Sequence, residues 1–154
     1  MTVIYSNASI REVLAGIAVS RAAAALPQST QTAMFTVSGG RVLITYFVMQ
    51  VTTVIQSQAT TVQFIATPTA GTAVNLTNST GDINGKEVGA SVTFATTLGG
   101  TAVVNNAGAN VLAAPVFMMN PGTLDLKTAA SSTGAVKLDL TYIPLDTSAS
   151  VAAA

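Results

Sequence analysis

The segment from Asp82 to Glu87 is the only part of the sequence in which acidic side chains cluster with an amide and a glycine. Carboxylate and amide oxygens in one loop are the ligand types that Ca²⁺ prefers. An EF-hand, however, uses more oxygen ligands in a longer loop that ends on a distant glutamate. Because Asp82, Asn84 and Gly85 are also common turn residues, we interpret the segment as a solvated turn that binds no metal ion.

Serine and threonine are abundant, but the sequence offers no group that would activate one of them as a nucleophile. It contains no histidine and no cysteine, and neither a Gly-x-Ser-x-Gly nor a Ser-x-x-Lys motif occurs. Asp125 and Asp139 are candidates for a pair of carboxylates that cleaves glycosidic bonds, but they alternate with Lys127 and Lys137 on strand faces that we expect to be solvated. The sequence therefore predicts a protein that is not an enzyme and has no cofactor.

The composition points instead to contacts with other protein chains. Charged residues make up 8% of the 154 residues and hydrophobic residues 49%, whereas a typical soluble domain is roughly 25% charged. We therefore expect neighbouring chains, beginning with further copies of this one, to cover part of the weakly hydrated surface. The net charge is +0, which predicts no nucleic-acid partner. No apolar stretch approaches the roughly 20 residues of a membrane-spanning helix, so we expect no membrane partner.

Residues 1–33 differ in pattern from the rest of the chain, and we interpret them as an N-terminal arm or short helix followed by a linker. Ser9 and Glu12 have the spacing of a capping box, in which each side chain satisfies a backbone N–H group of the other residue. Apolar residues then recur at helical spacing, and Pro27 prevents a helix from continuing. These signals predict a helix from about Ser9 to Ser20, with an extended arm as the alternative.

Residues 34–146 have the pattern of an antiparallel β-sandwich. The longest candidate strand runs from Arg41 to Gln56, and its first half is apolar on both alternating faces. Shorter candidate strands, separated by turns rich in Gly and Asn, follow at 60–67, 73–78, 90–96, 101–104 and 111–119. Many short strands with turn signals between them favour an all-β sandwich, which we expect to be jelly-roll-like. Residues 147–154 would form a C-terminal tail.

The end of this domain predicts a hairpin. Leu124 and Leu126 alternate with polar residues, and so do the apolar residues of the segment from Val136 to Tyr142. A loop at Ser132-Thr133-Gly134 between the two strands would set Lys127 opposite Asp139, an attractive pair of charges. We therefore expect these strands to be neighbours in one sheet.

A strand that is apolar on both faces lies either between two packed layers or between its own core and a partner chain. The second alternative makes the strand that begins at Arg41 a candidate for subunit contacts. Arg41 itself either pairs with a carboxylate or carbonyl at an interface or packs its stem on the strand end with its head in water. Our interface candidates are Arg41, Leu43, Phe47 and Met49 on this strand, with Ile10, Leu14 and Val151 near the chain ends.

Several stretches of the sequence resemble small virion-associated proteins of tailed bacteriophages. The resemblance covers roughly residues 21–146 and is carried by Phe35–Thr45, Val51–Thr60, Pro68–Thr72, Gly122–Leu126 and Tyr142–Asp146. It implies a structural protein of the virion and assigns no catalytic residue. Made in the host cytoplasm, such a protein would be located on the capsid surface.

The function that we expect from this resemblance is that of a capsid decoration or cement subunit. Its partners would be other copies of itself, with a trimer matching capsid symmetry, and the major capsid protein. A head-fibre base or tail component is the alternative among structural proteins. A carbohydrate-binding module is the alternative from another class, and it would require exposed aromatic side chains.

Overall fold

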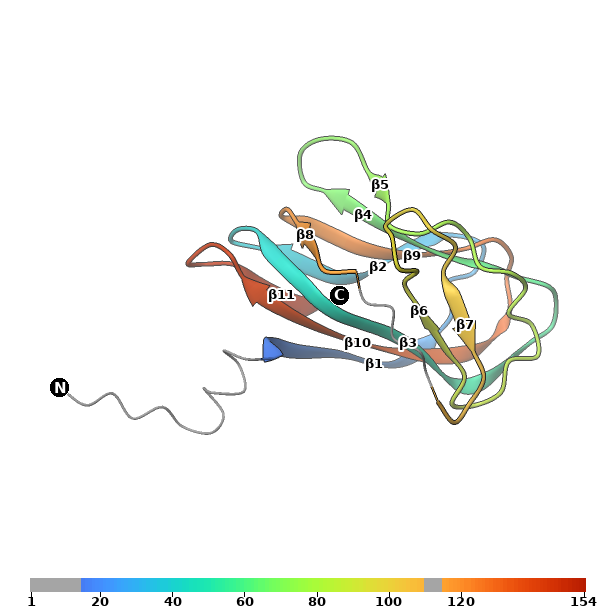
Figure 1. Cartoon of the computed structure of the whole chain (residues 1–154). Helices are drawn as coiled ribbons and strands as arrows, with labels where there is room; N and C mark the ends of the chain where they lie inside the picture. Colours follow the sequence, from blue (N-terminus) through green and yellow to red (C-terminus); the bar gives the residue numbers. More distant parts are fainter. Residues whose placement is uncertain (1–14, 110–114) are drawn as a thin grey trace.

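The computed structural model describes residues 15–109 and 115–154, which form strands and connecting loops. The strands are β1 (Ile17–Ala25), β2 (Gln31–Ser38), β3 (Val42–Gln56), β4 (Val62–Pro68), β5 (Val74–Asn75), β6 (Ser91–Thr93), β7 (Val103–Asn105), β8 (Phe117–Met119), β9 (Gly122–Thr128), β10 (Thr133–Pro144) and β11 (Ser150–Ala153). They make two antiparallel sheets that pack against each other (Figure 1). The prediction of an all-β sandwich is confirmed.

The strand order is that of a jelly roll. The first sheet has the order β1-β10-β3-β6-β7, and β8 also pairs with β3; the second has the order β11-β2-β9-β4-β5. The pairs β1–β10, β2–β9 and β3–β8 are nested in the sequence, and strands β1 to β4 alternate between the sheets. A long hairpin folded over onto itself produces this nesting, which defines the jelly roll.

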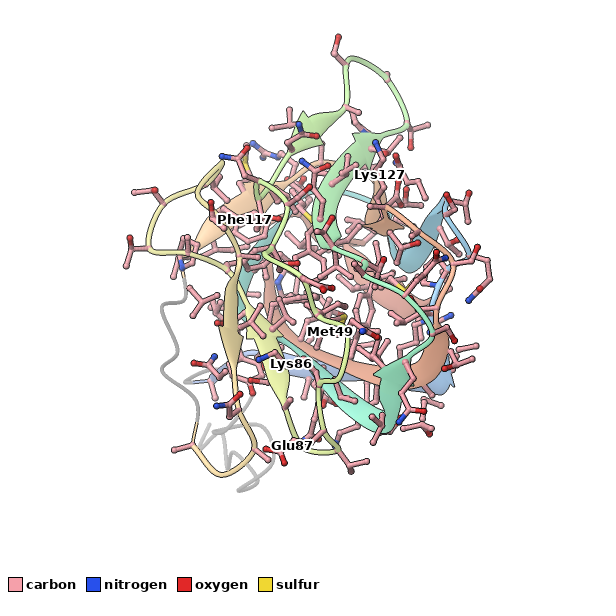
Figure 2. The ribbon with its side chains drawn as sticks, turned by 90° about the vertical axis from the view of Figure 1, so that its right-hand side faces the viewer. Met49, Lys86, Glu87, Phe117 and Lys127 are labelled. Carbon is pink, nitrogen blue, oxygen red and sulfur yellow. The ribbon has the colours of Figure 1, made fainter. Side chains whose placement is uncertain are left out.

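The core lies between the sheets and is built by alternation along each strand. From the second sheet, Phe64, Leu124 and Leu126 are fully buried, and from the first sheet Leu138 and Met49 face them. Met49 lies near the middle of the molecule in Figure 2. The strand faces that the sequence marks as apolar therefore meet across the sandwich.

The predicted helix from Ser9 to Ser20 is wrong from Ile17 onward, although Ala15 is helical. Residues 17–20 belong to β1, an edge strand that pairs with β10 over the register from Ile17↔Tyr142 to Ala25↔Ala135. The spacing of apolar residues reads as helical, but backbone pairing with a twelve-residue neighbour outweighs this weak local preference. Gly16 belongs to no regular element, and residues 9–14 of the predicted helix lie outside the described residues.

The first and last strands, β1 and β11, are both edge strands of the sheets. β1 and the start of β2 fall within residues 1–33, and β11 falls within the segment that the sequence suggests is a tail. β11 pairs with β2, with Val151 opposite Val37, and the Ala154 N–H donates to the Met34 carbonyl at 3.0 Å. Arg21 of β1 donates from Nε to the Ala154 carbonyl at 3.2 Å, which ties the two edge strands together.

The predicted hairpin of the last two long strands is also wrong, because β9 and β10 lie in different sheets. Lys127 lies opposite Gln31 and Gln63, while Asp139 lies opposite Ser20 and Val48. One apolar face on each strand fits two neighbours in one sheet, and it fits equally well two strands that face each other across a core. The structure takes the second arrangement, with the connection at 129–132 crossing from sheet to sheet.

Candidate interaction surface

Apolar side chains gather on the outer face of the first sheet, at the end where β8 joins it. The register aligns Ile143 of β10 with Leu43 of β3, and Leu43 with Met118 of β8. These three residues alternate with buried neighbours along their strands and therefore point away from the core. Together with residues next to them they form what we call the outer patch: Leu43, Tyr46, Val116, Met118, Ile143 and Leu145.

A bulge in β3 brings Tyr46 to the same face as Leu43. Tyr142 lies opposite Ile44, but the preceding Thr141 lies opposite Tyr46, so Thr45 is an extra residue on β3. The Thr45 hydroxyl donates to the Thr141 carbonyl at 3.2 Å, which holds the bulge. Partial burial of Tyr46 raises the pKa of its phenol, and the nearby Asp139 carboxylate raises it further.

The outer patch contains no charged residue, and three of its six side chains are exposed while Leu43, Tyr46 and Ile143 are half-buried. Val116 is 57% exposed, Met118 52% and Leu145 44%. Most monomeric proteins avoid a contiguous surface of this kind, and where it occurs it usually marks an interface. Four other large apolar side chains of the described residues are exposed. Two of them, Val74 and Leu98, line a groove beside the patch, and the other two, Val88 and Val103, lie elsewhere.

This groove is an opening of about 180 Å³ between β8 and the β4–β5 edge of the second sheet. Met118 lines both the groove and the outer patch, so the two surfaces are continuous. Val74 and Leu98 form exposed parts of the wall, and Phe117 contributes from the core side. An apolar side chain of a partner could enter here without meeting a charged residue of the lining.

The rim of the outer patch carries an ion pair within the chain. Arg41 donates from Nε to Asp146 Oδ2 at 3.0 Å and from Nη2 to Asp146 Oδ1 at 2.9 Å, and its backbone N–H adds a bond of 2.7 Å to Oδ2. The side-chain hydrogen bond from Arg41 and then the backbone one lower the pKa of Asp146 from an ordinary 3.8 to about 2. Of the two expectations for Arg41, pairing with a carboxylate is realised, but inside the same chain.

This pair predicts an acid-dependent loss of stability. A carboxyl whose pKa is lower in the folded state adds stability above its ordinary pKa, and this stability is lost as the pH falls from about 4 to about 2. Because both side chains are partly exposed, the loss is expected to be modest. Thermal unfolding between pH 5 and about 2 should therefore show a smaller decrease in Tm for Asp146→Asn than for the parent chain. Parallel curves for the two proteins would contradict the assignment.

The outer face of the second sheet is polar by contrast. Gln31, Gln63, Thr67, Asp125 and Lys127 lie on it, and Asp125 Oδ2 accepts hydrogen bonds from Gln31 Nε2 at 2.6 Å and Thr67 Oγ1 at 2.7 Å. Asp125 is only 5% exposed, and its Oδ1 has no hydrogen-bond partner among the described residues. The expectation that Asp125 is solvated is therefore wrong, because Gln31 and Thr67 of the two neighbouring strands cover its carboxylate. The outer patch therefore differs in polarity from this face, and also from the other end of its own sheet, where Lys137 Nζ and Asp139 Oδ2 lie 3.9 Å apart on the outward side of β10.

The acidic loop at 82–87 binds its own chain. Asp82 Oδ1 accepts the backbone N–H groups of Thr60 and Asn84, both at 2.9 Å, and these bonds lower the pKa of Asp82. Lys86 and Glu87 bond to the turn at Asn106 and Ala107. Figure 2 shows Lys86 and Glu87 in the lower half of the view and Lys127 in the upper half. Nowhere in residues 15–109 and 115–154 do three His, Cys, Asp or Glu side chains group as metal ligands.

Of the predicted interface residues, some lie on the surface, some lie in the core and two lie outside the described residues. Leu43 lies in the middle of the outer patch and Arg41 at its rim. Phe47 and Met49 are 3% and 0% exposed, so they belong to the core, because the bulge at Thr45 moves them to the inner face. Val151 is 7% exposed and pairs beside Val37 inside the sandwich. Ile10 and Leu14 lie outside the described residues.

Sequence reasoning missed five members of the patch: Tyr46, Val116, Met118, Ile143 and Leu145. For β8 no signal was available, since Val116 to Met119 is apolar at every position. On β10 a signal existed, because the face that carries Lys137, Asp139 and Thr141 continues with Ile143 and Leu145. A change from polar to apolar along one outward face indicates where solvent is replaced by a partner.

The comparisons with known proteins give no relative. No family model, curated protein or solved structure matches this chain. Within the described residues, no helix has the length and hydrophobicity needed to cross a membrane.

Proposed function

We propose that this chain is a structural subunit of a bacteriophage virion, and that it decorates the capsid by binding copies of itself and the major capsid protein. The observation that carries the proposal is the outer patch with its groove, an apolar and nearly uncharged surface at one end of the outer face of the first sheet. The jelly roll supports it, because viral capsid proteins use this architecture repeatedly. The resemblance of residues 21–146 to small virion proteins agrees with both.

The mechanism is burial of the patch against neighbours. Apolar surface removed from water contributes about 25 cal/mol per Å². A patch of a few hundred Å² therefore gives a single weak contact once the cost of association is subtracted. Many copies on one shell add such contacts together, so that the assembly is held far more firmly than any pair.

The alternatives receive less support. A head-fibre base or tail component would use the same kind of patch, and the location within the virion separates it from a capsid subunit. A carbohydrate-binding module needs exposed aromatic rings to stack on sugars. All five phenylalanines are buried, and Tyr142 is 5% exposed, so Tyr46 is the one aromatic side chain of the described residues that reaches the surface appreciably.

The test is a pair of charge substitutions on the patch. Leu43→Asp combined with Met118→Asp should weaken self-association and binding to phage capsids that lack the protein by about tenfold or more, since each carboxylate would be buried without a partner. Light scattering after size-exclusion chromatography measures the first, and co-sedimentation with capsids the second. Electron microscopy of the labelled particles shows whether the protein binds heads or tails.

Thr36→Asp is the matched control, because Thr36 is exposed on the polar second sheet. It should leave association and capsid binding unchanged. If the doubly substituted patch behaves like this control, the outer patch is not the interface and the proposal fails.

A further inference from the structure

We propose that the side chains of Gln31 and Thr67 join in an intramolecular ester bond, which the folded chain forms on itself with the Asp125 carboxylate as the base. The three residues lie on β2, β4 and β9, which are neighbours in the second sheet with β9 in the middle. The bond would fasten β2 to β4 across β9. This inference concerns the domain alone and does not depend on the proposed function.

The second sheet brings a hydroxyl, a carboxylate and a carboxamide into direct contact. Thr67 Oγ1 donates to Asp125 Oδ2 at 2.7 Å, and Gln31 Nε2 donates to the same oxygen at 2.6 Å. Gln31 Nε2 also donates to Thr67 Oγ1 at 3.3 Å. A hydroxyl that donates to a base while it contacts an acyl group is in the position of a nucleophile.

The strand register explains this contact between residues far apart in the chain. On β2, Gln31 lies opposite Lys127, two residues beyond Asp125. On β4, Thr67 lies opposite Thr123, two residues before Asp125. Both side chains therefore reach the Asp125 carboxylate diagonally from either side, on the same outward face.

The surroundings of Asp125 suit a base. It is 5% exposed, and no cation pairs with it within the described part of the chain. Its Oδ1 has no hydrogen-bond partner there. Buried carboxylates usually have a cation or a full set of donors, so this one keeps an oxygen that is able to accept a proton. The Thr67 hydroxyl proton already points at the same carboxylate.

The reaction exchanges an amide for an ester and needs no further reactant. Thr67 Oγ1 attacks Cδ of Gln31, and its proton passes to Asp125. The bond between Cδ and Nε2 then breaks, and Asp125 returns the proton to the nitrogen, which leaves as ammonia. The terminal torsion of a glutamine side chain is broad, so the amide can turn its carbon toward Oγ1. Because Gln31 is exposed, the ammonia escapes into the solvent.

The paired strands supply the proximity that an ordinary threonine lacks. Reacting groups held about 3–3.5 Å apart behave as if one were present at about 10⁵–10⁸ M. β9 is paired along its length with β2 on one side and β4 on the other, so the three side chains are held in place together. The ester should therefore form only after the second sheet has folded.

The mass of the full-length chain tests the bond. Ester formation releases one ammonia, so the parent chain should be about 17 Da lighter than its sequence requires. Trypsin cuts after Lys and Arg, which places Gln31 in peptide 22–41 and Thr67 in peptide 42–86. Tandem mass spectrometry should find these two peptides joined.

Three substitutions assign the roles. Thr67→Val has nearly the same shape but no hydroxyl, so it should have the full mass and separate peptides, whereas Thr67→Ser should remain joined. Asp125→Asn should slow the joining by about a hundredfold or more, because it removes the base. Thr123→Val is the matched control, since Thr123 lies opposite Thr67 on the same face, and it should be joined like the parent chain. Circular dichroism should show the same strand content in all four variants.

A parent chain with the full mass and separate peptides would overturn the proposal. Loss of ammonia confined to peptide 42–86 would also overturn it, because Asn84 before Gly85 can lose ammonia by cyclising. Conversion of Gln31 to glutamate without a link would show that water, and not Thr67, attacks the amide. These readouts use the free chain, so their failure leaves binding through the outer patch untouched, and failure of the patch variants to weaken capsid binding leaves the ester untouched.

Discussion

Replacing Phe64 with alanine is expected to lower the free energy of unfolding by about 3–5 kcal/mol, since deletion of a buried ring leaves a cavity that the core fills only in part. Phe64 is 0% exposed and belongs to the second sheet. Its ring lies 4.8 Å from that of Phe47 and 5.5 Å from that of Phe94, both in edge-to-face geometry. Phe94 in turn packs against Phe117 at 5.3 Å. Phe64 is thus the ring through which the second sheet joins this cluster.

Equilibrium unfolding in urea measures this loss, and Phe64→Leu is the control. Leucine keeps most of the buried volume, so its cost should be well below that of alanine. A domain of ordinary stability has about 5–15 kcal/mol, so the alanine variant should be marginally folded. A loss of less than about 1 kcal/mol would show that the ring cluster does not hold the sheets together.

Gly39→Ala is the second substitution with a large expected effect. Gly39 has a φ of 73°, and a Cβ atom there would overlap the backbone carbonyl oxygen of Ser148. The left-handed backbone costs a non-glycine residue about 1–2 kcal/mol. The overlap adds to this cost, because the Ser148 carbonyl belongs to the short connection between β10 and β11 and cannot move away freely. We expect a loss of more than about 2 kcal/mol in stability.

Gly85→Ala separates the cost of the left-handed backbone from the cost of the overlap with Ser148. Gly85 has a similar φ of 78°, but nothing lies within 4 Å of its Cβ position. It should lose only the backbone part, about 1–2 kcal/mol. The two variants compared by urea unfolding give the cost of the contact between the β2–β3 turn and the segment that leads to β11. Equal losses of stability in the two variants would mean that the Ser148 backbone moves aside at no energetic cost.

Much of the fold could be predicted from local patterns. Alternation of apolar and polar residues on the segments that became β9 and β10 identifies strands, and the low charge identifies a chain with weakly hydrated surface. What such patterns leave open is the partner of each strand. Leu124 and Leu138 need only to face the same core, and strands in one sheet or in two opposite sheets satisfy this equally. The pairing of β10 with β1 and of β9 with β2 places β9 and β10 in opposite sheets.

The candidate surface was predictable only in part. Leu43 lies on the outer face of β3 and Arg41 just before this strand, but Phe47 and Met49 lie in the core because Thr45 is an extra residue in β3. A bulge reverses which face every later side chain occupies, and its energy comes from a neighbouring strand rather than from local sequence.

The sequence alone therefore determined the class of the fold and the poverty of charge on its surface, since both follow from composition and from local periodicity. Only the tertiary structure decided which strands are neighbours, where β3 changes phase, and that Leu43, Met118 and Ile143 share one outward row. These depend on backbone pairing between segments far apart in the chain. Such pairing is selected by how well whole faces pack together, and no short window of sequence contains that information.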